Sequence, residues 1–148
     1  MRTLCTIGVV VLTLAACGGP VSAPEEQLRA WVAAGAEAAK DKDRRELVSM
    51  ISESYADARG NERSDIDKLF RVYFLRQQKI ALLTSIEQIT VYADTAAKIE
   101  MTVGMAGMND GVLGLSADAY RFELELEKDA DEWQLISARW GELGEEMR

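Results

Sequence analysis

The first half of the chain carries apolar residues at the three- and four-residue spacing that is typical of helices. This spacing predicts a first helix over residues 23–40. Its apolar face is made of Leu28, Trp31, Val32 and Gly35. A second helix is expected to begin at Asp43, which has Glu46 three residues later as a capping partner, and to end near Ser54.

The longest predicted helix covers residues 65–83, with Ser64 as the residue that caps its first turn. A wide apolar stripe runs along it, made of Ile66, Leu69, Phe70, Tyr73, Phe74 and Ile80. Before it, Gly60 and Asn61 favour a turn, so residues 55–61 are expected to form a loop or a very short strand. We expect this third helix to lie across a sheet.

From Ile86 onward the apolar spacing changes to two, which is typical of strands. In the clearest strand, Tyr120, Phe122, Leu124 and Leu126 alternate with Arg121, Glu123, Glu125 and Glu127. Turns are predicted at residues 94–95, 109–111 and 129–131. Three helices followed by about four antiparallel strands predict an α+β fold.

The amino terminus has the layout of a secretory signal, with Arg2 followed by an apolar run that is shorter than a membrane-spanning helix. The run ends in Leu-Ala-Ala-Cys at residues 14–17, which resembles the lipobox of bacterial lipoproteins. The resemblance implies that residues 1–16 are cleaved, that the Cys17 sulfur is lipidated, and that residues 17–22 tether a domain of residues 23–148 to the bilayer. The alternatives are an uncleaved anchor or a chance match.

Composition narrows the functions that we consider. The chain has 17 basic and 25 acidic residues and a net charge of −8, which disfavours binding to nucleic acid. It has no histidine, which removes the commonest zinc ligand and histidine-based catalysis, so no metal site is expected. No glycine-rich phosphate loop or dinucleotide fingerprint is present, and we expect no cofactor.

Three features point to a known fold. The first helix is aliphatic, Tyr55 and Asp57 precede Gly60 between the second and third helices, and the last strand carries Trp133 and Trp140. Together they resemble the nuclear transport factor 2-like superfamily, which includes SnoaL-type cyclases and ketosteroid isomerase. The resemblance implies a curved sheet wrapped around the long helix, forming a cone with an internal cavity. Another small α+β fold, cystatin-like or ferredoxin-like, has the same order of elements.

Catalysis in this superfamily suggests one kind of site. Its isomerases use an aspartate base with a tyrosine as oxyanion donor. The residues of this chain that could take such roles are Asp57, Tyr55 and Tyr73. The alternative for Asp57 is a solvated or capping carboxylate near Arg59, and the alternative for Tyr73 is packing in the core.

A cavity of this fold would be lined by aromatic residues, and the candidates are Trp31, Phe70, Tyr73, Tyr92, Tyr120 and Phe122. Packing in the core is the other interpretation of these rings. Residues 104–115 combine methionines with glycines and form either a flexible hairpin or a docking surface. The acidic row on the outer face of the third strand disfavours self-association, so we expect a monomer.

We therefore expect a membrane-anchored bacterial lipoprotein, without catalytic activity, that binds a small apolar ligand or an envelope protein. Gly18 stands where aspartate would retain a lipoprotein in the inner membrane, which favours the outer membrane, facing the periplasm. One alternative is a SnoaL-like cyclase, isomerase or dehydratase that acts on a small apolar substrate with a buried carboxylate base. Another is an envelope assembly subunit that acts through residues 104–115.

Overall fold

The computed structural model describes residues 23–108 and 115–147. The expected signal peptide, Cys17 and the tether of residues 17–22 lie outside the described residues, as does the expected turn at 109–111. The helices are α1 (Ala23–Lys40), α2 (Arg44–Ser49) and α3 (Arg63–Arg76). None of the helices in this part of the chain is long and apolar enough to cross a membrane.

Two helix predictions are confirmed. The first helix covers the expected residues, and it is the longest described helix with 18 residues. The second helix begins where its cap predicts, because the backbone N–H of Glu46 donates to the Asp43 side chain over 3.1 Å. This helix ends at Ser49, a few residues before the expected end near Ser54.

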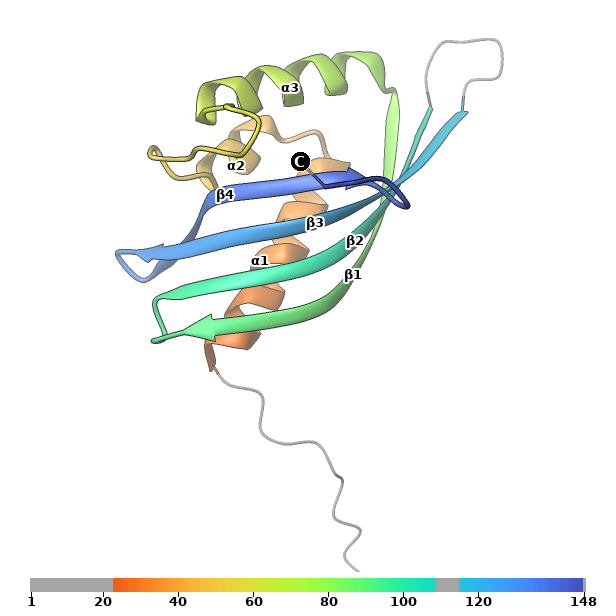
Figure 1. Cartoon of the computed structure of the whole chain (residues 1–148). Helices are drawn as coiled ribbons and strands as arrows, with labels where there is room; N and C mark the ends of the chain where they lie inside the picture. Colours follow the sequence, from red (N-terminus) through yellow and green to blue (C-terminus); the bar gives the residue numbers. More distant parts are fainter. Residues whose placement is uncertain (1–22, 109–114, 148) are drawn as a thin grey trace, which may run out of the picture.

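The third helix differs from its prediction at both ends, and the expectation that it lies across the sheet is wrong, because α1 takes that place (Figure 1). Its N-terminal cap is Glu62, which forms a capping box with Asp65, in place of Ser64. It ends at Arg76, because Gln77 already has extended backbone angles, φ −107° and ψ 125°. The predicted last two turns belong to strand β1 instead, since the backbone from Lys79 onward pairs with strand β2. Ile80 fits both the spacing of a helix and the alternation of a strand, so the sequence indicates a helix only weakly there. The pairing with β2 decides in favour of the strand.

The second half of the chain forms one antiparallel sheet in the order β1-β2-β3-β4. The strands are β1 (Lys79–Tyr92), β2 (Ala96–Met108), β3 (Leu115–Asp129) and β4 (Glu132–Glu142). Figure 1 shows that the sheet is curved, with α1 lying across one face and α3 standing at the β4 edge. The predicted α+β class, with helices packed in a curved sheet of four strands, is confirmed.

The core lies between α1 and the inner face of the sheet. Leu28 of α1, Ile99 of β2 and Leu126 of β3 are its largest fully buried side chains. The alternation of β3 decides which residues enter this core, because successive strand side chains point to opposite faces. Phe122, Leu124 and Leu126 therefore pack inward.

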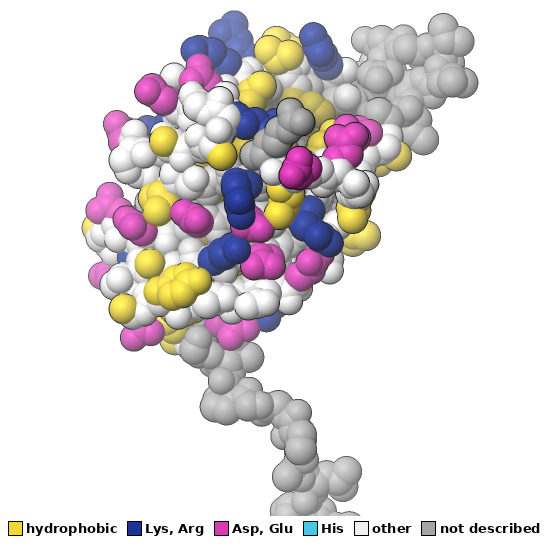
Figure 2. All heavy atoms as spheres, in the orientation of Figure 1, with side chains coloured by type: hydrophobic (Ala, Val, Ile, Leu, Met, Phe, Trp, Pro, Cys, Tyr) yellow, Lys and Arg dark blue, Asp and Glu magenta, His cyan; other side chains and the backbone are white. Residues whose placement is uncertain are grey.

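The outer face of the sheet carries charges of both signs, which Figure 2 shows interspersed over the molecule. Glu123 of β3 pairs with Arg139 of β4 and, over 3.1 Å, with Lys98 of β2. The Arg139 guanidinium, helped by Lys98, lowers the pKa of Glu123. These partners partly neutralise the acidic row that the sequence predicts for this face.

Candidate functional site

A cavity of about 530 Å³ lies between α3 and the sheet. Ile66 is the one residue of α3 that is buried, so most of the apolar stripe of this helix faces the cavity and the solvent. The lining residues come from all three helices and three strands: Trp31, Gly35, Leu47, Met50, Ile51, Tyr55, Ile66, Leu69, Phe70, Tyr73, Met105, Tyr120, Phe122, Leu124, Leu135, Ala138 and Trp140. No acidic or basic side chain is among the described lining residues.

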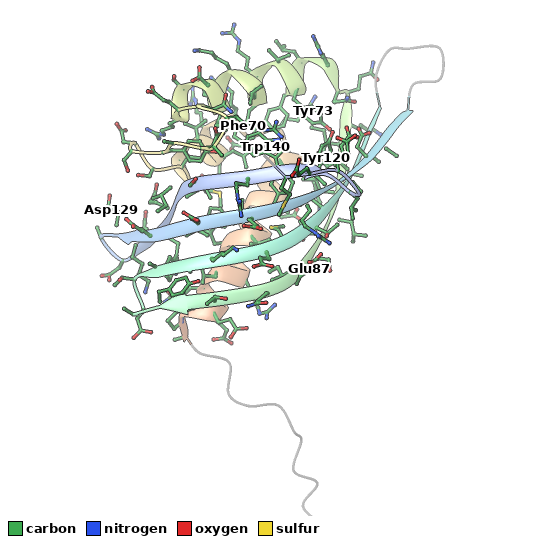
Figure 3. All side chains as sticks on the ribbon, in the orientation of Figure 1. Phe70, Tyr73, Glu87, Tyr120, Asp129 and Trp140 are labelled. Carbon is green, nitrogen blue, oxygen red and sulfur yellow. The ribbon has the colours of Figure 1, made fainter. Side chains whose placement is uncertain are left out.

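Aromatic rings from two sides face each other across this cavity. Phe70 and Tyr73 come from α3, on one side of the cavity. Tyr120 of β3 and Trp140 of β4 lie on the other side, as Figure 3 shows. The strand rings are held in register, because Phe122 and Trp140 are cross-strand partners whose rings stack with centroids 6.4 Å apart. Their flat faces suit a planar apolar ligand.

A second, more polar hollow shares two lining residues with the cavity. Tyr120 and Trp140 also line a neighbouring hollow of about 860 Å³, together with Arg59, Gly141, Glu142, Glu145 and Glu146. The Arg59 guanidinium lies 4.3 Å above the Trp140 ring, and its Nη2 donates to the Trp140 carbonyl oxygen over 2.8 Å. This cation–π contact holds the Trp140 ring, which lines both hollows.

Two tyrosines of the lining are held in their protonated form. Burial and the nearby negative charge of Asp118 raise the pKa of Tyr73. Burial, Asp118 and Glu142 raise the pKa of Tyr120 in the same direction. These shifts extend the protonated form, which tyrosine has at neutral pH in any case, to a higher pH.

Asp57 lies in the loop between α2 and α3 and is not among the cavity-lining residues. Its carboxylate accepts four hydrogen bonds, from the Tyr55 hydroxyl, the backbone N–H of Arg59, and both the backbone and side-chain amides of Asn61. Burial alone would raise its pKa, but these hydrogen bonds outweigh burial and lower it. A carboxylate so well bonded is a weak base and serves to hold the loop.

Tyr55 connects this loop to the cavity. Its side chain is 3% exposed and belongs to the lining, while its hydroxyl donates to Asp57 over 3.2 Å. Burial and the adjacent Asp57 charge raise the Tyr55 pKa well above its ordinary value. The Tyr55 residue therefore borders the cavity, while its hydroxyl proton is used in the hydrogen bond to Asp57 in the loop.

Two further findings concern polar side chains in the described part of the chain. No group of three or more carboxylate, cysteine or histidine side chains there lies close enough to hold a metal ion. Two buried side-chain atoms lack a hydrogen-bond partner among the described residues, the Trp31 Nε1 and the Gln77 Oε1. Trp31 belongs to the cavity lining, whereas Gln77 does not.

Comparison with known proteins addresses the fold. No family model matches the chain, and no curated protein matches it in sequence. A protein from Novosphingobium aromaticivorans DSM 12444, assigned as a scytalone dehydratase, matches with a TM-score of 0.73 at 11% identity, over 83% of this chain and 85% of that chain. A ketosteroid isomerase-like protein from Erwinia carotovora atroseptica matches with a TM-score of 0.66 at 12% identity, over 81% and 96%.

A third solved structure comes from the nuclear transport factor 2-like family of Streptomyces avermitilis and is assigned as a dehydratase. It matches with a TM-score of 0.66 at 13% identity, over 78% of this chain and 93% of that chain. The chain has the nuclear transport factor 2-like fold. Because one fold hosts many functions, the function of this chain must be argued from its own cavity.

Most of the aromatic candidates come together in the cavity between α3 and the sheet. The lining includes Trp31, Phe70, Tyr73, Tyr120 and Phe122. The structure does not bring Tyr92 there, since it ends β1 with its side chain 53% exposed. Its neighbour Val91 packs on the core, and adjacent strand residues point to opposite faces.

Sequence reasoning missed several lining residues on the helices. Leu47 and Met50 of the α2 region and Leu69 of α3 border the cavity, although their spacing only indicated an apolar helix face. Trp133 of β4 is buried in the core and is not among the lining residues. The signal available in the sequence was apolar character, which does not distinguish a residue that borders a cavity from one that fills it.

Proposed function

We propose that the folded domain binds a small, largely apolar molecule in the cavity between α3 and the sheet. The observation that carries this proposal is a cavity of about 530 Å³ whose described lining has no charged side chain. Protein interiors normally leave few voids larger than a water molecule, whereas ligand sites occupy about 300–1,000 Å³. The volume and the aromatic walls are those of a binding site.

The binding proposal can be tested by filling the cavity. Ala138 of β4 is buried and borders the cavity, so Ala138→Leu would project a larger side chain into it. Ser137→Leu is the matched control, since it adds a leucine to the next residue of the same strand, on the other face. We expect wild type and Ser137→Leu to bind the neutral fluorescent probe N-phenyl-1-naphthylamine equally, and Ala138→Leu to bind it about tenfold more weakly. Equal binding by all three would refute the proposal.

We also propose that this domain is tethered to the bacterial cell envelope through acylated Cys17, on the periplasmic side of the outer membrane. The support is the signal layout before Cys17 and the Leu-Ala-Ala-Cys sequence. Two or more acyl signals are needed for a stable lipid anchor, which the triacylation of lipoproteins would supply. Cys17→Ala should abolish labelling with radioactive palmitate and release the protein from the membrane fraction. Continued labelling of this variant would rule out the anchor.

A second candidate is an acid–base enzyme of the dehydratase or isomerase type acting on a small apolar substrate. The fold neighbours favour it at least as well as they favour simple binding, since two are assigned as dehydratases and one is ketosteroid isomerase-like. In this chain no carboxylate belongs to the described lining. The base would then be Asp118, whose charge acts on Tyr73 and Tyr120 at the cavity.

One measurement distinguishes the binding function from the enzymatic function. An enzyme of this type removes a proton next to a carbonyl group, so it would catalyse deuterium exchange into the methyl group of 2-acetylnaphthalene in D₂O. Exchange above the buffer rate that is lost in Asp118→Asn would favour the enzyme. Binding of the ketone without exchange would favour the non-catalytic role.

A further inference from the structure

Two carboxylates flank Tyr120 on the cavity face of the sheet. Asp118 precedes Tyr120 by two residues on β3, so both side chains point to the same face. The cross-strand partner of Asp118 on β2 is Met105, which lines the cavity. Glu142 of β4 is the cross-strand partner of Tyr120 itself. Both carboxylates belong to solvent-exposed residues, so a ligand at this end of the cavity can reach them.

The negative charge at this end acts on rings from both sides of the cavity. Burial is the larger cause of the raised pKa values of Tyr73 and Tyr120, and the charge of Asp118 adds to it in both. The charge of Glu142 adds further to the raised pKa of Tyr120. Asp118 is therefore close to a ring of α3 as well as to a ring of β3.

The hollow beside the cavity extends this negative region. The two hollows share Tyr120 and Trp140. The charged lining of the second hollow consists of three carboxylates and one cation, which are Glu142, Glu145, Glu146 and Arg59. Arg59 is already held by the ring and the carbonyl oxygen of Trp140. No ion pair between described residues involves Asp118 or the three glutamates, so their charge is not neutralised there.

The surroundings of these carboxylates indicate which cation they suit. In residues 23–108 and 115–147, no group of three or more carboxylate, cysteine or histidine side chains could hold a metal ion. The carboxylates lie instead beside aromatic rings, at the end of a cavity whose described lining is uncharged. Aromatic faces and carboxylates both attract an organic ammonium group, and the cavity beyond them suits an apolar body.

We propose that the ligand is an amphiphilic organic amine, with its apolar body in the cavity and its protonated ammonium group beside Tyr120, between Asp118 and Glu142. This inference rests on the proposed binding function and adds the chemical class and orientation of the ligand. The body lies between the rings of α3 and those of β3 and β4. The ammonium group stays at the exposed carboxylates, where it is paired and hydrated, which avoids the cost of burying a charge.

The test compares three naphthalene probes that differ in one group. 2-Naphthylmethylamine is protonated at neutral pH, 2-naphthylmethanol is uncharged, and 2-naphthoate is an anion. The protein is the full 148-residue chain in its non-lipidated Cys17→Ala form, and calorimetry measures each Kd at low salt. We expect the amine to bind about five- to tenfold more tightly than the alcohol, and the anion to bind most weakly. Salt at about 0.5 M should reduce this preference, because it screens exposed charges.

Variants locate the ammonium group and the apolar body. The double variant Asp118→Asn with Glu142→Gln should lower the preference for the amine over the alcohol to less than about twofold, with the alcohol Kd unchanged. Glu125→Gln with Glu127→Gln is the matched control, because it removes two exposed charges from the outer face of β3; it should keep the wild-type preference. Ala138→Leu should weaken the binding of both the amine and the alcohol, because it fills the cavity.

The outcomes separate the two proposals. If the alcohol binds as tightly as the amine, or if the preference survives without Asp118 and Glu142, the amine assignment is overturned and binding in the cavity stands. If Ala138→Leu weakens the alcohol and leaves the amine unaffected, the amine binds elsewhere and the assignment is also overturned. If the double variant does not fold, the two single variants give the same comparison. If no probe binds, the binding function fails, and this inference fails with it.

Discussion

Replacement of Asp57 by asparagine tests whether this residue holds the loop between α2 and α3. The substitution keeps the size of the side chain and removes its charge. One carboxylate oxygen accepts from the backbone N–H groups of Arg59 and Asn61, each over 2.9 Å, and the amide oxygen of asparagine can keep both bonds. The other oxygen accepts from the Tyr55 hydroxyl over 3.2 Å and from the Asn61 side chain over 2.8 Å. An NH₂ group in its place can accept neither.

The expected cost follows from the lost bond with the Asn61 side chain and from the lost negative charge, which leaves at best a weaker neutral bond in which the asparagine NH₂ donates to the Tyr55 oxygen. Hydrogen bonds to a charged group contribute about 1.5–3 kcal/mol each when buried, and this loop is only partly buried, so we expect Asp57→Asn to lower the free energy of unfolding by about 1–3 kcal/mol in total. Urea denaturation at neutral pH, followed by circular dichroism, measures this difference. Asp129→Asn, at the exposed β3–β4 turn, is the control for loss of an acidic charge and should change the stability by less than about 0.5 kcal/mol.

The pH dependence sharpens this prediction. The folded-state pKa of Asp57 is lowered from 3.8, so its contribution to stability is present above that value and is lost as the pH falls through the folded pKa. The gap between wild type and Asp57→Asn should therefore be full at neutral pH and narrow in acid. Equal stability at neutral pH, or a gap that stays constant into acid, would contradict the reasoning. Probe binding by folded Asp57→Asn should be unchanged, because Asp57 is outside the lining.

Three further changes test other parts of the fold. Leu28→Ala should destabilise the domain by about 2–5 kcal/mol in urea denaturation, because Leu28 is fully buried, whereas Leu83→Ala, at a side chain that is 77% exposed, should change little. Gly107→Ala should lower the melting temperature, because a Cβ there would lie 2.2 Å from the Gln77 Oε1, and Gln77→Ala should relieve that effect in the double variant. Tyr55→Phe should reduce the loss of stability in alkali. The raised Tyr55 pKa means that its contribution is present below the unfolded value of 10.0 and is lost as the pH rises above it.

The aromatic side of the cavity was largely predictable, because local rules decide it. Phe70 and Tyr73 share one face of a helix through their three-residue spacing, and Tyr120 and Phe122 share one face of a strand through alternation. The same alternation explains why Tyr92 is absent from the cavity: it sets Tyr92 opposite Val91, which packs on the core. An assignment of lining residues by the face of the strand on which they lie, rather than by their aromatic character, would have excluded Tyr92 from the cavity.

The sequence by itself determined the order of three helices and four strands, the start of α2 at its Asp43 cap, and the split of β3 into an apolar and an acidic face. These features depend on residues a few positions apart, so the chain specifies them locally. Only the tertiary structure decided that α3 ends at Arg76, because the backbone from Lys79 onward forms strand β1 and pairs with β2. It alone decided that a cavity is left between α3 and the sheet, and that Gln27 pairs with Trp133. Those features depend on contacts between residues far apart in the chain, and no local spacing encodes the distance between two packed layers.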